Sequence, residues 1–342
     1  MKYFDTEILK TSFGSKNSPS NHTFLFLVKL PDYYINTSLV VGYSHEYNDN
    51  LREEHDKYKD ILQLNFTDAY RNMTYKHLAA YWWVANQCGE NVQYVLKTDD
   101  DQAVDVHHLQ LFMEMFILPQ KLQNFYLCHY LEEQVPRRDP DNKWHVSRNE
   151  YESDSYPNFC SGWAYVTNIN TLSKVLGTKS KIGSFPCLRF LQFNLLCFYS
   201  TKFLPPIQCQ IRLDSSPSIK IFFLFSEASH HQPYFWIDDL WVTGHLVEQL
   251  QIPVHIFNWK NNFLSEHIQA KDDLLKGKMF TPELMVASDL EPGEIRHLAS
   301  KFDKCHKKQC YNQVYDSKEL KEYMRPPMTI RRPAGSSMKT EL

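Results

Sequence analysis

Three adjacent aspartates follow a short apolar run, and their types and spacing could do chemistry. The stretch reads KTDDDQAVD over residues 97–105, directly after VQYVL. Neighbouring like charges repel, and each carboxylate costs more to desolvate where a strand end is partly buried. We therefore expect a cation to compensate Asp99, Asp100 and Asp101. Carboxylates at the C-terminal edge of a sheet commonly hold a hard divalent cation, which can bridge phosphate oxygens.

Other interpretations of these carboxylates remain open at this point. The triplet could be a solvated acidic turn, or a cluster at a helix N-terminus stabilised by the helix dipole. A second pair, Asp238–Asp239, lies in the aromatic stretch YFWIDDLW. Aromatic surroundings desolvate a carboxylate and raise its pKa, which makes it a better general base. The pair could equally cap a helix over residues 239–250.

Strand and helix patterns alternate before and around the triplet. Apolar runs predict strands over 24–28, 38–42, 60–64 and 92–96, and helical spacing predicts helices over 48–58, 73–87 and 105–116. Asn72 is the expected N-cap of the helix over 73–87. This alternation predicts an α/β fold with a mixed, mostly parallel sheet and helices on both faces. Ligands bind beyond the carboxyl ends of strands in such sheets, and the triplet follows one of those ends.

The rest of the chain is less regular. Residues 130–158 are polar and predict a surface segment with little regular structure, while 160–176 predict a turn, a strand and a helix. Residues 178–232 show neither the two-residue period of a strand nor the 3.6-residue period of a helix. They could be a translated intron, so we expect a non-native insert there. The Pro-, Ser- and Lys-rich end, 325–342, predicts a disordered tail.

Composition describes a folded protein. The chain has 342 residues, 43% of them hydrophobic, and a net charge of −3, so it can bury a sizeable core and gives no basic patch for nucleic acid. It has eight cysteines and no C-x-x-C pair, which argues against a zinc ribbon. The better disulfide candidates, whose pairing stays open, are Cys88, Cys128, Cys160, Cys305 and Cys310.

Acceptor sequons point to a secretory environment. N-x-[ST] occurs at Asn21, Asn36, Asn65 and Asn72, and the sequons together with the cysteines favour a secretory lumen. Yet no signal peptide is visible, and no run reaches the roughly 18 apolar residues that span a bilayer. We therefore expect either a cytosolic protein or a chain that lacks its targeting segment.

Several longer stretches occur in a familiar order. The first, DILQLNFTDAYRNMTYK, resembles D-I-L/I followed by F-x-D-x-Y-x-N-L-T-x-K, and KTDDD resembles K-x-D-D-D. Further along, KWHV resembles K-W-x-V, YPNFCSG resembles Y-P-x-Y-C-S-G, and IDD resembles E-D-V. Near the start of the chain, LKTSFG is a less exact version of I-R-x-T-W-G. With these motifs the chain resembles the beta-1,3-galactosyltransferase and beta-1,3-N-acetylglucosaminyltransferase family of inverting glycosyltransferases. The resemblance covers about residues 5–300, apart from 178–232.

The resemblance implies a fold and a division of the chain. It implies the GT-A fold, in which a Rossmann-like domain binds a nucleotide sugar and a metal at an Asp-x-Asp motif. Residues 1–177 would form the half that binds the donor, and 233–310 the half that binds the acceptor and carries the base. The family's members are glycoproteins of the Golgi apparatus, held in the membrane as type II proteins by an N-terminal anchor that this chain does not show.

The resemblance also assigns residues to the donor. Asp101 would ligate Mn²⁺ most directly, with Asp99 as a further metal ligand. Asp99, Asp100, Lys10 and Lys97 would bind the UDP-sugar. Lys10 stands where the family has Arg, and this exchange matters because only Arg forms a bidentate fork. On this interpretation, Mn²⁺ is the cation that compensates the triplet.

The remaining assignments concern the transfer itself. Asp239 would take the proton from an acceptor hydroxyl, which attacks the anomeric carbon opposite UDP and gives a beta-1,3 product. Gly162, Trp163 and Asp238 are the expected substrate contacts, and Trp163 would either stack on a sugar or fill the core. The product of this hexosyltransferase chemistry would be a glycan on protein or lipid.

One departure from the family motivates an alternative function. Relatives carry a metal-ligating His late in the domain, where this chain has Ala287 and Ser288, and His297 is the nearest imidazole. A pseudoenzyme that binds UDP-sugar or glycan without turnover is therefore the alternative, and a cytosolic metal-dependent phosphohydrolase is a third possibility. The donor sugar, the acceptor glycan and the oligomeric state are not determined by the sequence.

Overall fold

The structure is a computed structural model, and it describes the chain in blocks. Side chains are described for residues 69–85, 92–99, 101–177, 235–257, 286–288 and 290–308, and the backbone alone for the strands elsewhere. The strands are β1 (Thr23–Lys29), β2 (Tyr34–Tyr43), β3 (Ile61–Thr67), β4 (Tyr94–Asp99), β5 (Ala103–Val104), β6 (Phe125–Leu131), β7 (Phe159–Asn168), β8 (Phe193–Phe198), β9 (Ile207–Leu213), β10 (Ile219–Phe223), β11 (His255–Asn258), β12 (Val286–Ala287) and β13 (Ile330–Arg331).

The helices are mostly short. The α-helices are α3 (Met73–Trp83), α4 (Val106–Phe112), α5 (Ile169–Val175), α6 (Leu246–Gln249) and α8 (Pro292–Lys307). Shorter 3₁₀ or π turns adjoin them: η1 (Tyr70–Asn72), η4 (Met113–Ile117), η5 (Leu118–Gln120) and η7 (Leu240–His245). None of the helices in the described part of the chain combines the length and apolar character that crossing a bilayer requires.

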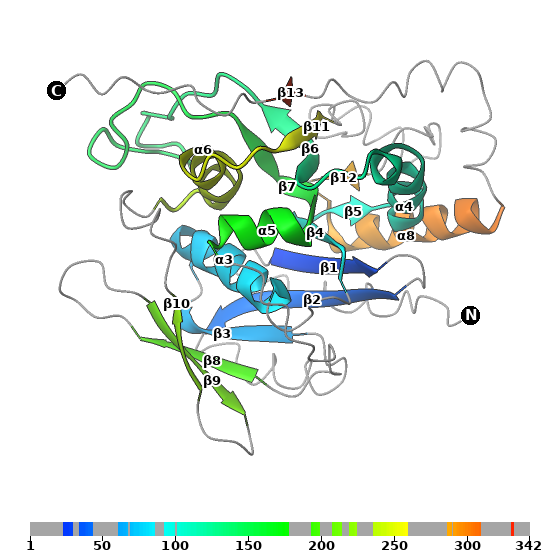
Figure 1. The fold of residues 1–342 in the computed structure, drawn as a ribbon, viewed down its shortest axis with the longest axis horizontal. Coiled ribbons are helices and arrows are strands. Elements are labelled where there is room, and N and C mark those ends of the chain that lie inside the picture. Colours follow the sequence, from blue (N-terminus) through cyan, green and yellow to red (C-terminus); the bar gives the residue numbers. More distant parts are fainter. Residues whose placement is uncertain are drawn as a thin grey trace.

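Eleven of the described strands form one mixed sheet. Their order is β10-β9-β8-β3-β2-β1-β4-β7-β6-β11-β13, and β12 pairs separately with β5. Figure 1 shows α3, α5 and α6 together along the sheet, while α4 and α8 lie near β5. The carboxyl end of β4, which carries the acidic triplet, lies in the middle of this order between β1 and β7.

The prediction of a mostly parallel sheet is wrong. Of the ten strand pairings in the described sheet, three are parallel: β2 with β3, β3 with β8, and β6 with β11. Parallel neighbours need a crossover of a dozen or more residues, whereas β1 ends at Lys29 and β2 begins at Tyr34. The connection from β6 to β7 contains the irregular loop 132–158 and no crossover helix, so the chain returns antiparallel.

The prediction of helices on both faces is confirmed by the alternation along the central strands. Val95 and Tyr165 belong to the core that contains residues of α3, α5 and α6. Their neighbours Leu96 and Val166 belong to a second core with Leu109 and others of α4 and η4. Successive residues of a strand point to opposite faces, so β4 and β7 are apolar on both sides. A buried central strand of this kind can hold a polar side chain only if that side chain is paired.

The predicted elements are found with small shifts. All four predicted strands exist, and helices begin at Met73 and Val106 as expected, whereas the predicted helix over 48–58 lies outside the described residues. Asn72 precedes α3 but makes no side-chain capping bond. The predicted turn at the start of 160–176 is wrong, because Cys160–Gly162 already belong to β7, which is then followed by α5 as predicted.

Two unusual segments contribute strands to the sheet. Within 178–232 the backbone of β8, β9 and β10 is described, and β8 pairs with β3. Whether this segment is native stays a prediction, as do the boundaries of the two halves of the domain. Of the predicted tail over 325–342, only the backbone of Ile330–Arg331 is described, paired with β11.

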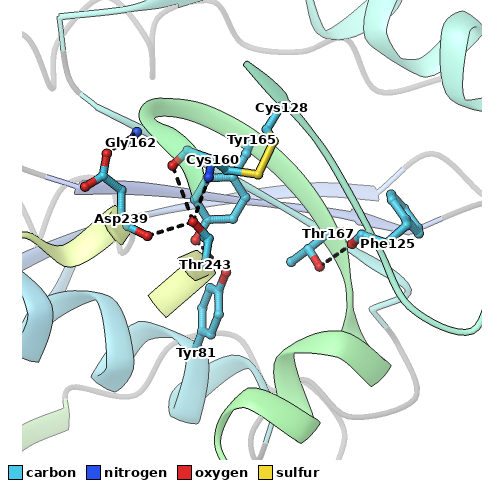
Figure 2. Close-up of a disulfide and its surroundings, with 9 residues drawn as sticks. All are labelled: Tyr81, Phe125, Cys128, Cys160, Gly162, Tyr165, Thr167, Asp239 and Thr243. Carbon is cyan, nitrogen blue, oxygen red and sulfur yellow. Dashed lines mark hydrogen bonds between the residues drawn. A yellow bond between two sulfur atoms is a disulfide. The ribbon is translucent and has the colours of Figure 1, made fainter. Parts of the chain in front are cut away.

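A disulfide joins β6 to β7 beside the central strands. Cys128 and Cys160 are bonded, with Cα atoms 5.6 Å apart and a sequence separation of 32. Both residues are buried, and Figure 2 shows the bond next to Gly162 and Tyr165. Both were disulfide candidates from the sequence. Cys305 is buried in α8, and Cys88 and Cys310 lie outside the described residues. The bond fixes the start of β7, where the C-S-G motif lies.

Removing this disulfide should lower the free energy of unfolding by about 2–4 kcal/mol, since the cross-link restricts the unfolded chain. Urea unfolding of the wild type and of Cys128→Ala/Cys160→Ala, each with and without dithiothreitol, measures the loss. We expect reductant to destabilise the wild type and to have much less effect on the double variant. An equal response of both proteins to reductant would show that this bond contributes nothing.

Candidate active site

The acidic triplet lies where β4 ends, but its members have different surroundings. Asp99 is the last residue of β4, Asp101 follows in a turn, and Asp100 lies outside the described residues. Asp101 accepts a hydrogen bond from Gln102 Nε2 at 2.7 Å, and its backbone oxygen accepts one from Leu290 N at 2.9 Å. Neither described member caps a helix; the cap of α4 is Asp105, whose Oδ1 accepts from His108 N at 3.0 Å.

A buried lysine compensates the charge of Asp99. Lys97 is 1% exposed, and its Nζ donates to Asp99 Oδ1 at 2.5 Å and to the backbone oxygen of Gly162. Burial raises the pKa of Asp99, Lys97 opposes this, and the pKa reaches about 7. Burial lowers the pKa of Lys97, but Asp99 and Asp238 outweigh it and the pKa is raised. The cation expected beside the triplet is therefore, at Asp99, part of the chain itself.

Asp239 reaches the same place from another part of the chain. Its Oδ2 accepts from Gly162 N at 2.7 Å, and its Oδ1 accepts from Leu240 N at 2.8 Å. The hydroxyl of Thr243 donates to the backbone oxygen of Asp239 at 2.7 Å and accepts from Cys160 N at 2.9 Å (Figure 2). Each carboxylate oxygen of Asp239 thus has a backbone donor that fixes its direction.

The backbone of one residue, Gly162, connects the two groups of carboxylates. Gly162 accepts from Lys97 through its oxygen and donates to Asp239 through its nitrogen. Lys97 in turn contacts Asp99, so the end of β4 and the start of η7 meet across the third residue of the C-S-G motif. The structure thereby brings together three distant parts of the sequence: Lys97 and Asp99, Gly162, and Asp239.

The two carboxylates of the 238–239 pair differ in basicity. Burial raises the pKa of Asp239, and the neighbouring charge of Asp238 raises it further, against the opposing effect of Lys97. Burial acts on Asp238 as well, but Lys97 and a hydrogen bond from His77 outweigh it and the pKa of Asp238 falls below its usual value. Adjacent acids whose pKa values are pushed apart are typical of sites that assign one of them to proton transfer.

Sequence reasoning missed the groups beneath this pair. His77 lies within the helix predicted over 73–87 and has no neighbouring motif that marks it as functional, yet its Nδ1 lies 2.8 Å from Asp238 Oδ2. On its other side, the imidazole is hydrogen-bonded through Nε2 to the hydroxyl of Tyr165, which is hydrogen-bonded to the hydroxyl of Tyr81 in the core. No local pattern relates residue 77 to residue 238, so only the packing of α3 reveals the contact. Trp163, by contrast, is partly buried and packs against the core beneath α4.

Mn²⁺ would find part of a coordination shell here. Carboxylate oxygens such as those of Asp99 and Asp101 are suitable donors for a hard cation, and diphosphate and water would have to supply the rest. In the described part of the chain, no group of three or more His, Cys, Asp or Glu side chains is placed to hold a metal. Ala287 pairs with Ala103, two residues after Asp101, and Ser288 follows it, so no imidazole comes from this strand.

Several predicted residues lie outside this description. Lys10 and Asp100 are not described, and neither are the side chains of Asn21, Asn36 and Asn65. Asn72 is described and half-buried. Donor binding by Lys10 and Asp100, and glycosylation at the four sequons, stay predictions.

Comparison with known proteins identifies the family of this chain. The sequence matches the family Galactosyltransferase over residues 9–187, which is more than half of the chain. The chain belongs to the galactosyltransferase family. It is 34% identical to beta-1,3-galactosyltransferase 5 of Mus musculus over 139 residues, which are 41% of this chain and 44% of that protein. It is 33% identical to beta-1,3-galactosyltransferase 2 of Homo sapiens over 149 residues, 42% of this chain and 35% of that protein.

The range of the family match includes some of the candidate site residues and leaves out Asp239. The chain spans less than half of the length of these curated relatives. The family match contains Lys97, Asp99, Asp101 and Gly162 and ends at residue 187. Asp239 lies beyond that end, so its place in the site rests on its hydrogen bond to Gly162.

Substituting Gly162 should test how closely Asp239 is held. A Cβ on Gly162 would lie 3.0 Å from Asp239 Oδ2 and 3.1 Å from its Cβ, so Gly162→Ala must displace the carboxylate. We expect a loss of about 1–3 kcal/mol in the free energy of unfolding, as in other overpacked sites. Urea unfolding measures this change.

Gly293→Ala is the matched control. Gly293 lies in the first turn of α8, and a Cβ there would meet nothing closer than Arg296 Nη2 at 4.0 Å. Alanine should stabilise that helix by about 0.4–1 kcal/mol. Equal effects of the two substitutions would contradict the close contact between Gly162 and Asp239.

Proposed function

We propose that this protein is a hexosyltransferase that moves galactose or an N-acetylhexosamine from a UDP-sugar to a glycan hydroxyl. The transfer inverts the anomeric centre and forms a beta-1,3 linkage, on a domain of the GT-A type. One observation carries the proposal: Gly162 N donates a hydrogen bond to Asp239 at 2.7 Å, and the backbone oxygen of the same residue accepts one from Lys97. This pair of contacts supports a role for Asp239 as a base close to the acidic residues proposed to bind the donor.

The chemistry assigned to Asp239 is proton removal. The acceptor hydroxyl would give its proton to Asp239 while its oxygen forms a bond to the anomeric carbon, and the bond from that carbon to the UDP oxygen breaks on the opposite face. An α-linked donor thus gives a β-linked product. The backbone donors at Gly162 and Leu240 hold the carboxylate in a fixed direction, which lowers the cost of orienting it during the reaction.

Divalent metal binding belongs to the proposal through Asp101 and Asp99. When bound there, Mn²⁺ would supply Lewis-acid stabilisation to the leaving diphosphate. Asp101 is the stronger candidate ligand, because an oxygen of Asp99 already binds Lys97 at 2.5 Å. The metal-bound protein, a lumenal Golgi location and a membrane anchor outside this sequence are all part of the same hypothesis.

An aromatic surface next to the carboxylates supports a sugar as acceptor. Trp144 is 48% exposed, and its Nε1 donates to the hydroxyl of Tyr70 at 2.8 Å. Burial raises the pKa of Tyr70 to about 12, and the charges of Asp238, Asp239 and Asp99 add to this, so Tyr70 lies within their field. An amphipathic ring held by a hydrogen bond offers an apolar face to a sugar ring and a polar edge to its hydroxyls.

A pseudoenzyme is the second candidate, favoured by the strand beside the triplet. The backbone that pairs next to Asp101 presents Ala287 and Ser288 and no imidazole. The described residues alone do not complete a metal site. Such a protein would bind UDP-sugar or glycan and release no UDP.

UDP release from purified protein separates these functions. With Mn²⁺, UDP-galactose or UDP-N-acetylhexosamines and a glycan mixture, the wild type should release UDP, and chelation should stop release until Mn²⁺ is restored. Asp239→Asn should lower kcat about 10²- to 10⁴-fold, the usual contribution of a general base. Asp101→Ala should weaken the response to Mn²⁺.

Glu114→Gln is the matched control, since Glu114 is an exposed carboxylate of η4 that contacts Gln110. It should leave UDP release unchanged. Equal release from the wild type and both site variants would reject the transferase proposal. Binding of UDP-sugar without any release by the wild type would identify the pseudoenzyme.

The pH dependence should report the ionisation of Asp239. Its pKa is raised to about 7, chiefly by burial and then by Asp238, and the base acts only when deprotonated. We therefore expect kcat/KM to fall as the pH drops through about 7, approaching tenfold per pH unit. Initial rates at limiting substrate between pH 5 and 8.5 measure this, and a flat profile would contradict a base with a raised pKa.

A further inference from the structure

A fully buried histidine lies beneath the acid pair. His77 of α3 is 0% exposed, and its Nδ1 lies 2.8 Å from Asp238 Oδ2. Its Nε2 is hydrogen-bonded to the hydroxyl of Tyr165, and the two rings are stacked with centroids 5.8 Å apart. The rings of His77 and Tyr81 are nearly perpendicular, with centroids 4.9 Å apart. A buried imidazole held on both nitrogens has one orientation available to it.

The partners also determine which nitrogen carries the proton. An ionised carboxylate only accepts hydrogen bonds, so His77 Nδ1 must donate to Asp238. Burial lowers the pKa of His77, so the ring is neutral and its Nε2 is an acceptor. Burial raises the pKa of Tyr165, so the phenol keeps its proton and donates to that nitrogen.

The direction of the hydrogen bonds continues into the core. Tyr81 and Tyr165 join their hydroxyls at 2.5 Å, and since Tyr165 donates to His77, Tyr81 donates to Tyr165. The donors therefore run from Tyr81 through Tyr165 to His77 and end on Asp238. Hydrolase triads also join a carboxylate, an imidazole and a hydroxyl in this order, and there the carboxylate orients the imidazole. Here the carboxylate is Asp238, next to the proposed base, and the hydroxyl of Tyr165 lies in the core.

A second contact ties α3 to the same segment. The hydroxyl of Thr74, one turn before His77, donates to the backbone oxygen of Phe235 at 2.8 Å. Helix α3 thus contacts both the backbone at Phe235, three residues before Asp238, and the carboxylate of Asp238. Charged and titratable groups that face Asp238 and its neighbour from other elements are Lys97 and Asp99 of β4 and Tyr70 of η1.

We propose that His77 is a positioning residue for the transfer reaction. It acts through Asp238: its Nδ1–H holds that carboxylate in one place, and so fixes the negative charge and the backbone beside the base Asp239. This inference rests on the proposed function. It requires the donor nitrogen at position 77 and does not require the imidazole to gain or lose a proton.

Two substitutions of similar size distinguish the donor from the bulk of the side chain. The amide nitrogen of asparagine occupies about the place of imidazole Nδ1, so His77→Asn can still donate to Asp238. His77→Leu fills the space and donates nothing. In the UDP-release assay, His77→Leu should lower kcat about 10- to 100-fold with the donor KM within about twofold, and His77→Asn should regain most of that kcat.

A double-mutant cycle tests whether the effect passes through Asp238. Asp238→Asn should lower kcat to a similar extent, and adding His77→Leu to it should cause little further loss, because coupled residues are not additive. Additive losses, a wild-type kcat in His77→Leu, or equal loss in His77→Asn and His77→Leu would overturn the proposal. Thermal unfolding of each variant establishes that the proteins compared are folded.

A readout without turnover separates this inference from the proposed function. In ¹⁵N-histidine-labelled protein, the signal that disappears in His77→Asn identifies His77. It should show the Nδ1–H form in the wild type and change in Asp238→Asn. A wild-type Nε2–H form would overturn the inference whether or not UDP is released. Absence of UDP release with the Nδ1–H form present would reject the proposed function alone.

Discussion

The ammonium group of Lys97 is the interaction on which the site depends. It lies inside the sheet, 1% exposed, and its partners are a carboxylate at the end of its own strand and the backbone oxygen of Gly162 on β7. A buried cation is tolerated only with such partners, and a buried carboxylate only with such a cation. The ion pair with Lys97 compensates the charge of Asp99, the first residue of the acidic triplet. Lys97 also holds the backbone of Gly162, whose N–H donates to Asp239.

The sheet explains why these groups meet. β4 and β7 are antiparallel neighbours, and Lys97 pairs with Tyr165. Val95 and Tyr165 share the face beneath α3, and Lys97 follows Val95 by two residues, so its side chain lies on that face too. The disulfide at Cys160 fixes the start of β7, and Thr243 joins Cys160 to Asp239. The proposed donor site, the proposed base and the histidine beneath them therefore depend on one strand pair and the helix that covers it.

The sequence predicted the elements of this site better than their connections. Apolar runs and helical spacing identified β4, α3 and α4, because burial on one face leaves a period in the sequence. The motifs singled out Asp99, Gly162 and Asp239, which the fold brings close together, and the family that the motifs suggested is confirmed by the match over residues 9–187. The roles of these residues stay predictions. Strand direction was mispredicted, since alternating strands and helices suggest parallel crossovers, whereas short connections and an irregular loop return the chain antiparallel. The contacts of His77 with Asp238 and of Lys97 with Gly162 were missed, because a contact between residues that are distant in sequence leaves no local pattern.

Calorimetric and urea unfolding of Lys97→Met tests the central claim most directly, with Asp99→Asn and the double variant completing a cycle. Breaking a buried ion pair leaves one charge uncompensated and costs about 3–5 kcal/mol, so Lys97→Met should lose free energy of unfolding in that range. The double variant should be more stable than the sum of the single losses indicates, because the neutral amide no longer needs the ammonium. Strictly additive losses, or a loss below about 1 kcal/mol in Lys97→Met, would contradict the account, because surface ion pairs contribute only that much.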